Sequence, residues 1–111
     1  VTWSSENRSQ LIRVPAAKGP YVRFELRSPD PAANPYIAYA LLIYAGLDGI
    51  RRQLSLPEPV NLNLFTADRS VTEKLERLPS SLEEARGLAL QSPFIRQYMP
   101  EILEGRFAVS D

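Results

Sequence analysis

Residues 21–27 alternate between polar and apolar side chains, which is the pattern of a half-buried strand. The apolar face is formed by Val22, Phe24 and Leu26. A shorter β-rich run, residues 11–14, precedes this segment, and the turn-forming residues 15–20 separate the two. The pattern predicts an antiparallel hairpin with a long loop.

A helix is predicted to begin at Asn34, a favourable N-cap residue, with Pro35 in the first helical position. Residues 36–47 carry no charge, so this helix is predicted to be buried on most of its sides. Arg51 and Arg52 near its end suit the negative pole of the helix dipole.

The rest of the chain is less regular. Ser80 and Glu83 have the spacing of a capping box, and Ser92 followed by a proline restarts a helical turn. The expected fold is α+β, a hairpin or small piece of sheet packed by helices. The expected organisation is site-bearing strands over residues 1–30, a buried helix over 34–54, an irregular linker over 55–78 and short helices over 79–104.

Composition narrows the classes of function. The 13 basic and 13 acidic residues balance, which predicts no nucleic-acid partner. Without cysteine or histidine, thiolate sites, a Ser-His-Asp triad and an HExxH zinc site are excluded. The longest uncharged apolar run, residues 35–47, is shorter than the roughly 20 residues that cross a bilayer, so we expect a cytoplasmic protein without a membrane partner. The chain begins with Val1, and we expect it to be a piece of a longer protein.

The charged face of the second predicted strand offers candidate chemistry. Arg23, Glu25 and Arg27 are two residues apart, so neighbouring side chains emerge on one face about 7 Å from each other. A carboxylate between two guanidinium groups stays ionised and suits Mg²⁺, while guanidinium groups bind phosphate or carboxylate. Arg8 and Arg13 add two more such groups. Such a ladder is also common on solvated strand faces with weak ion pairs, so the spacing alone leaves both interpretations open.

Several stretches of the chain carry a more specific signal. They are Asn7-Arg8-Ser9, residues 12–15, 23–36 and 45–50, Asn63-Leu64 and residues 78–85. Over about residues 3–90 these stretches resemble the C-terminal part of the catalytic domain of bacterial-type glutamine synthetases. The run 23–36 is too long and unusual for chance agreement. The resemblance implies a homo-oligomeric ligase that makes glutamine from glutamate, ammonia and ATP through γ-glutamyl phosphate, with Mg²⁺ or Mn²⁺ between the substrates.

The resemblance also implies a role for individual residues. Arg8 and Arg13 would hold the nucleotide phosphates and the transferring phosphoryl group, and Arg27 would hold the carboxylate of glutamate. Glu25 would be a metal ligand. The residues implied to bind the nucleotide are Arg8, Arg13, Arg23 and Lys18, and those implied to be catalytic are Arg8 and Arg27.

The matched stretch omits parts that the family needs. The family's other metal-binding glutamates, its metal-binding histidine and its flap glutamate precede this segment, so the chain alone is expected to be inactive. Phe65 stands where some members carry a regulatory tyrosine, so nucleotidylation is not expected there. Two alternatives remain open: a glutamate–amine ligase that uses another amine, such as a polyamine or an aromatic amine, and a non-catalytic relative that acts as a binding or structural module.

Overall fold

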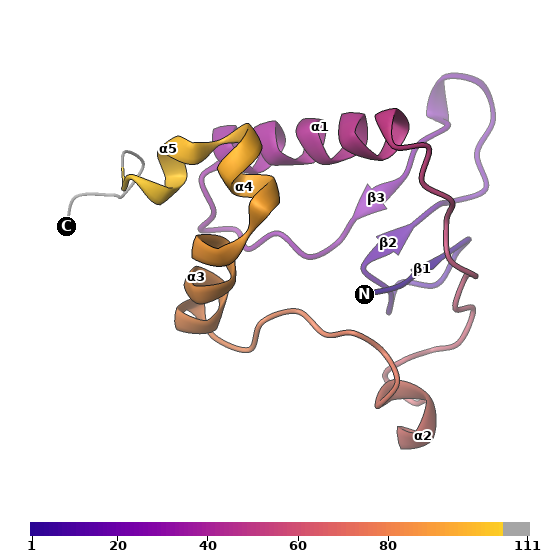
Figure 1. Ribbon diagram of the computed structural model, residues 1–111. Coiled ribbons are helices and arrows are strands. Elements are labelled where there is room, and N and C mark those ends of the chain that lie inside the picture. Colours follow the sequence, from indigo (N-terminus) through magenta and orange to yellow (C-terminus); the bar gives the residue numbers. More distant parts are fainter. Residues whose placement is uncertain (106–111) are drawn as a thin grey trace. The chain divides into compact units, whose positions relative to one another are not determined.

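The computed structural model describes residues 1–105 and has a mixed α+β fold with a small sheet, one long helix and several short ones (Figure 1). Contacts along the chain define two units. The first unit contains residues 1–33 and 55–78, and the second contains residues 34–54 and the segment from residue 79 onward. The first unit holds β1 (Trp3–Ser4), β2 (Ile12–Arg13), a 3₁₀ turn (Gly19–Tyr21), β3 (Glu25–Leu26) and α2 (Arg69–Thr72). The second holds α1 (Pro35–Arg51), α3 (Leu82–Gln91), α4 (Pro93–Tyr98) and α5 (Pro100–Leu103).

The sheet has the strand order β1-β2-β3. β2 and β3 are antiparallel with Arg13 opposite Glu25, which confirms the predicted hairpin. β1 lies within the predicted strand region and runs parallel to β2, with Trp3 opposite Ile12, a pairing that the predicted hairpin did not include. A strand of two residues is too short to show a period, so its sequence carries no local signal.

The paired part of the second strand is shorter than predicted. Only Glu25–Leu26 pairs as a strand, whereas Gly19–Tyr21 forms a 3₁₀ turn. The register that places Arg13 opposite Glu25 would place Pro15 opposite Arg23. Proline has no N–H to donate, so the ladder stops before that pair.

Polar side chains hold the first unit together. Trp3 donates its indole N–H to the carbonyl of Pro57 at 2.7 Å and accepts the N–H of Val60 at its own carbonyl at 2.8 Å. Gln10, which is 2% exposed, donates its amide to the carbonyls of Val60 at 2.6 Å and Leu62 at 2.8 Å. These bonds fasten the segment that follows residue 55 to β1 and to the residues before β2.

α1 begins where the sequence predicts. The Asn34 Oδ1 atom accepts the N–H groups of Tyr36 at 3.0 Å and Ile37 at 3.4 Å. The predicted burial is wrong, because Tyr36 is 85% and Ile50 is 75% exposed. An uncharged helix needs apolar neighbours all round, and within residues 1–105 no hydrophobic side chain is buried.

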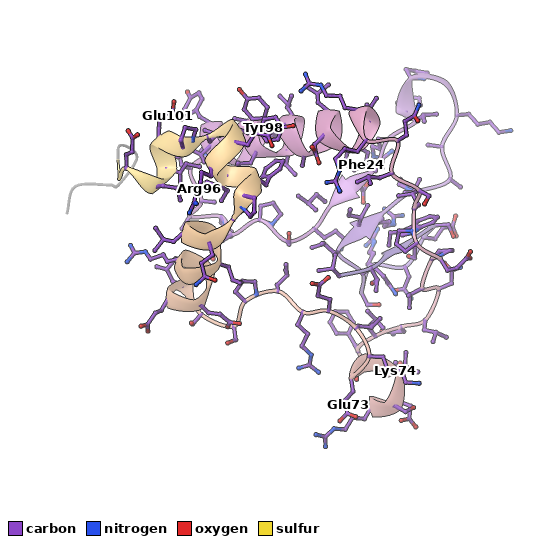
Figure 2. All side chains as sticks on the ribbon, viewed as in Figure 1. Phe24, Glu73, Lys74, Arg96, Tyr98 and Glu101 are labelled. Atoms are coloured by element: carbon purple, nitrogen blue, oxygen red, sulfur yellow. The ribbon has the colours of Figure 1, made fainter. Side chains whose placement is uncertain are left out.

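α4 covers one stripe of α1. Tyr98 lies on α4 (Figure 2), stacks on Tyr44 with ring centroids 5.0 Å apart and donates its hydroxyl to Asp48 at 3.2 Å. Phe94 also contacts Tyr98, with the rings tilted and their centroids 4.9 Å apart. The contact joins α1 to a helix fifty residues further along the chain.

The N-terminus of α3 is capped one residue later than predicted. The Ser81 hydroxyl accepts the N–H of Glu84 at 3.1 Å, and the Glu84 carboxylate accepts the N–H and the hydroxyl of Ser80, both at 2.8 Å. Because two serines are followed three residues later by two glutamates, the sequence fits both registers. α4 starts after Ser92 as predicted. No helix within residues 1–105 is long and apolar enough to cross a membrane.

Candidate functional site

Arg13, Arg23 and Glu25 form an ion-pair cluster across β2 and β3. The Nη1 atom of Arg13 lies 2.8 Å from Glu25 Oε2, and the Nη2 and Nε atoms of Arg23 lie 2.8 Å and 3.2 Å from Oε1. Arg13 is the cross-strand partner of Glu25, and Arg23 precedes Glu25 by two residues. The structure therefore brings together three of the side chains that the sequence singled out.

The cluster keeps its carboxylate charged. Hydrogen bonds from Arg13 and Arg23 hold the pKa of Glu25 below its ordinary value, and the bond from Arg13 has the larger effect. Both guanidinium groups are also fixed by main-chain oxygens, Arg13 by Glu6 at 3.1 Å and Arg23 by Tyr21 at 3.1 Å. The result is an ionised carboxylate, 30% exposed, between two oriented cations.

Glu25 has the donor chemistry of a ligand for a hard cation. Each of its oxygens already accepts a guanidinium N–H, and each keeps further lone-pair capacity. Among residues 1–105, however, no group of three or more acidic, histidine or cysteine side chains gathers. The chain can therefore supply one ligand, Glu25, to a divalent metal. A complete metal site would need further donors from outside the described residues.

Arg8 and Arg27 lie beside a separate cavity of about 460 Å³. The charged side chains lining this arginine cavity are Arg8, Arg27, Glu76 and Arg77. The cavity lies in the first unit, and Glu25 does not line it. The five candidate side chains on or near the hairpin thus divide between the ion-pair cluster and the arginine cavity.

A compact turn positions Arg8. The buried hydroxyl of Ser4 accepts the N–H of Asn7 at 2.9 Å and donates to its carbonyl at 3.1 Å. The Asn7 Oδ1 atom accepts the N–H of Ser9 at 2.9 Å, so the residues on both sides of Arg8 are fixed. The sequence interpretation gave these polar residues no role, although Asn7 and Ser9 flank Arg8 in one of the stretches that carry the resemblance.

Lys18 lies apart from both groups. It is exposed in the loop between β2 and β3, directly before the 3₁₀ turn, and its carbonyl accepts the N–H of Tyr21 at 3.3 Å. Its side chain lines neither the arginine cavity nor the ion-pair cluster.

Comparison with known proteins matches nearly the whole chain to one family. The family described as "Glutamine synthetase, catalytic domain" matches residues 1–109. A glutamine synthetase of Methanosarcina mazei is 44% identical over 103 residues, which cover 91% of this chain and 23% of the relative. A glutamine synthetase of Staphylococcus aureus strain MW2 is 42% identical over 109 residues, which cover 96% of this chain and 24% of the relative. The chain therefore spans about a quarter of the length of these relatives.

Proposed function

Because the chain belongs to the glutamine synthetase catalytic-domain family, we propose that it supplies part of the phosphate-binding site of an ATP-dependent glutamate–ammonia ligase. The observation that carries the proposal is the ionised Glu25 between Arg13 and Arg23, within the matched segment. Phosphoryl transfer needs charge neutralisation and in-line positioning, which fixed guanidinium groups supply.

The proposed reaction has two steps. A γ-carboxylate oxygen of glutamate attacks the terminal phosphorus of ATP, which forms γ-glutamyl phosphate and releases ADP. The nitrogen of ammonia then attacks the acyl carbon, loses a proton and displaces inorganic phosphate. Arg13 and Arg23 hold the nucleotide phosphates, Arg8 holds the transferring phosphoryl group, and Arg27 holds a carboxylate of glutamate. Lys18 is proposed as an outer contact of the nucleotide.

Glu25 would serve as one ligand of Mg²⁺ or Mn²⁺, and a bound divalent cation would neutralise charge on the phosphates. The remaining ligands would come from parts of the protein outside this chain, because no group of three or more acidic, histidine or cysteine side chains gathers within residues 1–105. We accordingly propose that the isolated chain is inactive, and that activity belongs to a longer, homo-oligomeric cytoplasmic protein containing it.

The test is phosphate release from ATP, measured with glutamate and ammonium in a full-length protein that contains this segment. Arg27→Gln should lower kcat/KM for glutamate by about 100-fold, as expected when a charged group loses its partner during catalysis. Arg51→Gln, which removes an exposed charge at the end of α1, is the matched control and should leave turnover unchanged.

Three results would count against the proposal. Arg27→Gln could retain full turnover, or the isolated chain could turn over robustly. The full-length protein could also require a polyamine or an aromatic amine in place of ammonium, which would make it a different glutamate–amine ligase. Absence of any nucleotide binding by the full-length protein would instead indicate a binding or structural module.

A further inference from the structure

The arginine cavity has a third cation beside the two for which the sequence suggested roles. Arg8, Arg27 and Arg77 all line it, opposed by the single carboxylate of Glu76. We infer that Arg77 is an anion-binding residue of this cavity and that the cavity takes a ligand that carries a phosphate group and at least two negative charges. The inference rests on the proposed function and deepens it by adding Arg77 to the site.

The charge balance of the cavity supports a polyanion. Three positive side chains against one negative leave a net side-chain charge of plus two. Within residues 1–105, ion pairs engage the arginines at 13, 23, 52 and 69, and none engages the three arginines of the cavity. Like charges around one cavity repel each other, so a ligand of opposite charge is favoured there.

The donors of the cavity are also free, unlike those of the ion-pair cluster. Arg13 and Arg23 already donate to Glu25, whereas the described part of the chain offers no hydrogen-bond acceptor to the side chains of Arg8, Arg27 or Arg77. An incoming phosphate therefore meets three guanidinium groups with unused N–H donors, which form short charge-assisted hydrogen bonds with phosphate oxygens.

Local main-chain contacts bring Arg77 to the cavity. After α2 the chain turns back, with the N–H of Lys74 bonded to Val71 at 3.3 Å and the N–H of Leu75 bonded to Thr72 at 3.2 Å. Arg77 thus lines the same cavity as Arg8, within the first unit.

Sequence reasoning had no means of finding this residue. Arg77 stands alone in an irregular segment, and it immediately precedes the stretch 78–85 that carries part of the resemblance. Its relation to Arg8, 69 residues earlier, appears only when the two segments are folded side by side.

The test titrates the 111-residue chain with pyrophosphate by isothermal titration calorimetry at low ionic strength. Arg77→Gln and Arg8→Gln should each raise Kd about tenfold, the loss expected for one charge-assisted contact. Arg77→Lys should fall between Arg77→Gln and the unchanged chain, because it restores the charge without the planar fork. Arg51→Gln should stay within about twofold, since it removes an equal charge elsewhere.

The outcomes separate this inference from the proposed function. Equal affinity of Arg77→Gln and the unchanged chain, or no pyrophosphate binding by the unchanged chain, would overturn the inference. An equal loss in Arg51→Gln would do the same, because it would show an effect of net charge alone. If Arg8→Gln weakens binding and Arg77→Gln does not, the role of Arg77 is wrong while the proposed role of Arg8 stands. Pyrophosphate binding with no ligase activity in the full-length protein would reject the proposed function and keep the anion site.

Discussion

Gln10 offers the most direct test of how the first unit is held together. It is 2% exposed, and its Nε2 atom donates to the carbonyls of Val60 at 2.6 Å and Leu62 at 2.8 Å. Its Oε1 atom lies 3.0 Å from the Ser9 hydroxyl. We predict that Gln10→Ala destabilises this unit, because alanine removes both donors and supplies no replacement.

The size of the effect follows from the bonds that are lost. The Ser9 hydroxyl keeps Asn7 Oδ1 as an acceptor at 2.8 Å, so the uncompensated loss is the two bonds from Nε2. A neutral hydrogen bond contributes about 1 kcal/mol net, so this loss should lower the free energy of unfolding by about 2 kcal/mol. A change of about 2 kcal/mol is roughly a thirtyfold shift in the folding equilibrium.

The assay is urea unfolding followed by tryptophan fluorescence. Trp3 is the single tryptophan, and its indole N–H bonds to Pro57 in the segment that Gln10 also fastens. Asn61→Ala is the matched control, because Asn61 is exposed beside Val60 and should change stability by less than about 0.5 kcal/mol. Equal unfolding midpoints for Gln10→Ala and the control would refute the reasoning.

Three further predictions concern other parts of the chain. Asn34→Ala removes the N-cap of α1 and should lower the stability of this helix by about 1 kcal/mol. The far-UV circular dichroism signal of the helix should fall in Asn34→Ala and stay unchanged in the control Asn61→Ala. The pKa of Glu25 is lower in the folded chain than in the unfolded chain. At a pH above the unfolded-state pKa, the ion pairs of Glu25 therefore contribute their full stability to the folded chain. This contribution is lost as the pH falls through the folded-state pKa. An NMR titration should show the Glu25 pKa rising more in Arg13→Gln than in Arg23→Gln, and the reverse order would contradict the assignment. The exposed apolar side chains predict that the chain self-associates, which light scattering can measure. A chain that stays monomeric at high concentration would contradict this prediction.

The hairpin was predictable because its signals are local. The period of two over residues 21–27 and the turn residues before it define two neighbouring strands. The length of the pairing depends on which residues face each other, and Pro15 limits it only in the register that the fold adopts. β1 pairs in parallel with β2, which lies several residues further along the chain, and the residues Trp3–Ser4 carry no signal that predicts this partner.

The same distinction applies to the candidate site. Alternation predicts that Arg23 and Glu25 share a face, and both lie in the ion-pair cluster. A strand pattern does not reveal which loop lies beside its end, so it could not show that Arg27 joins Arg8 at a separate cavity. Arg77 reaches that cavity from a segment fifty residues beyond Arg27, a relation that no local spacing encodes.

α1 shows why a correct element can accompany a wrong environment. The start of α1 depends on the Asn34 side chain and two nearby N–H groups. Because these groups lie within a few residues of each other, the sequence alone predicts where the helix begins. Its burial depends on apolar partners from elsewhere, and among residues 1–105 such partners leave Tyr36, Ile43 and Ile50 exposed. An uncharged helix surface indicates that the helix needs apolar neighbours, and it does not show whether this chain supplies them. That gap agrees with a chain that spans about a quarter of the length of its relatives.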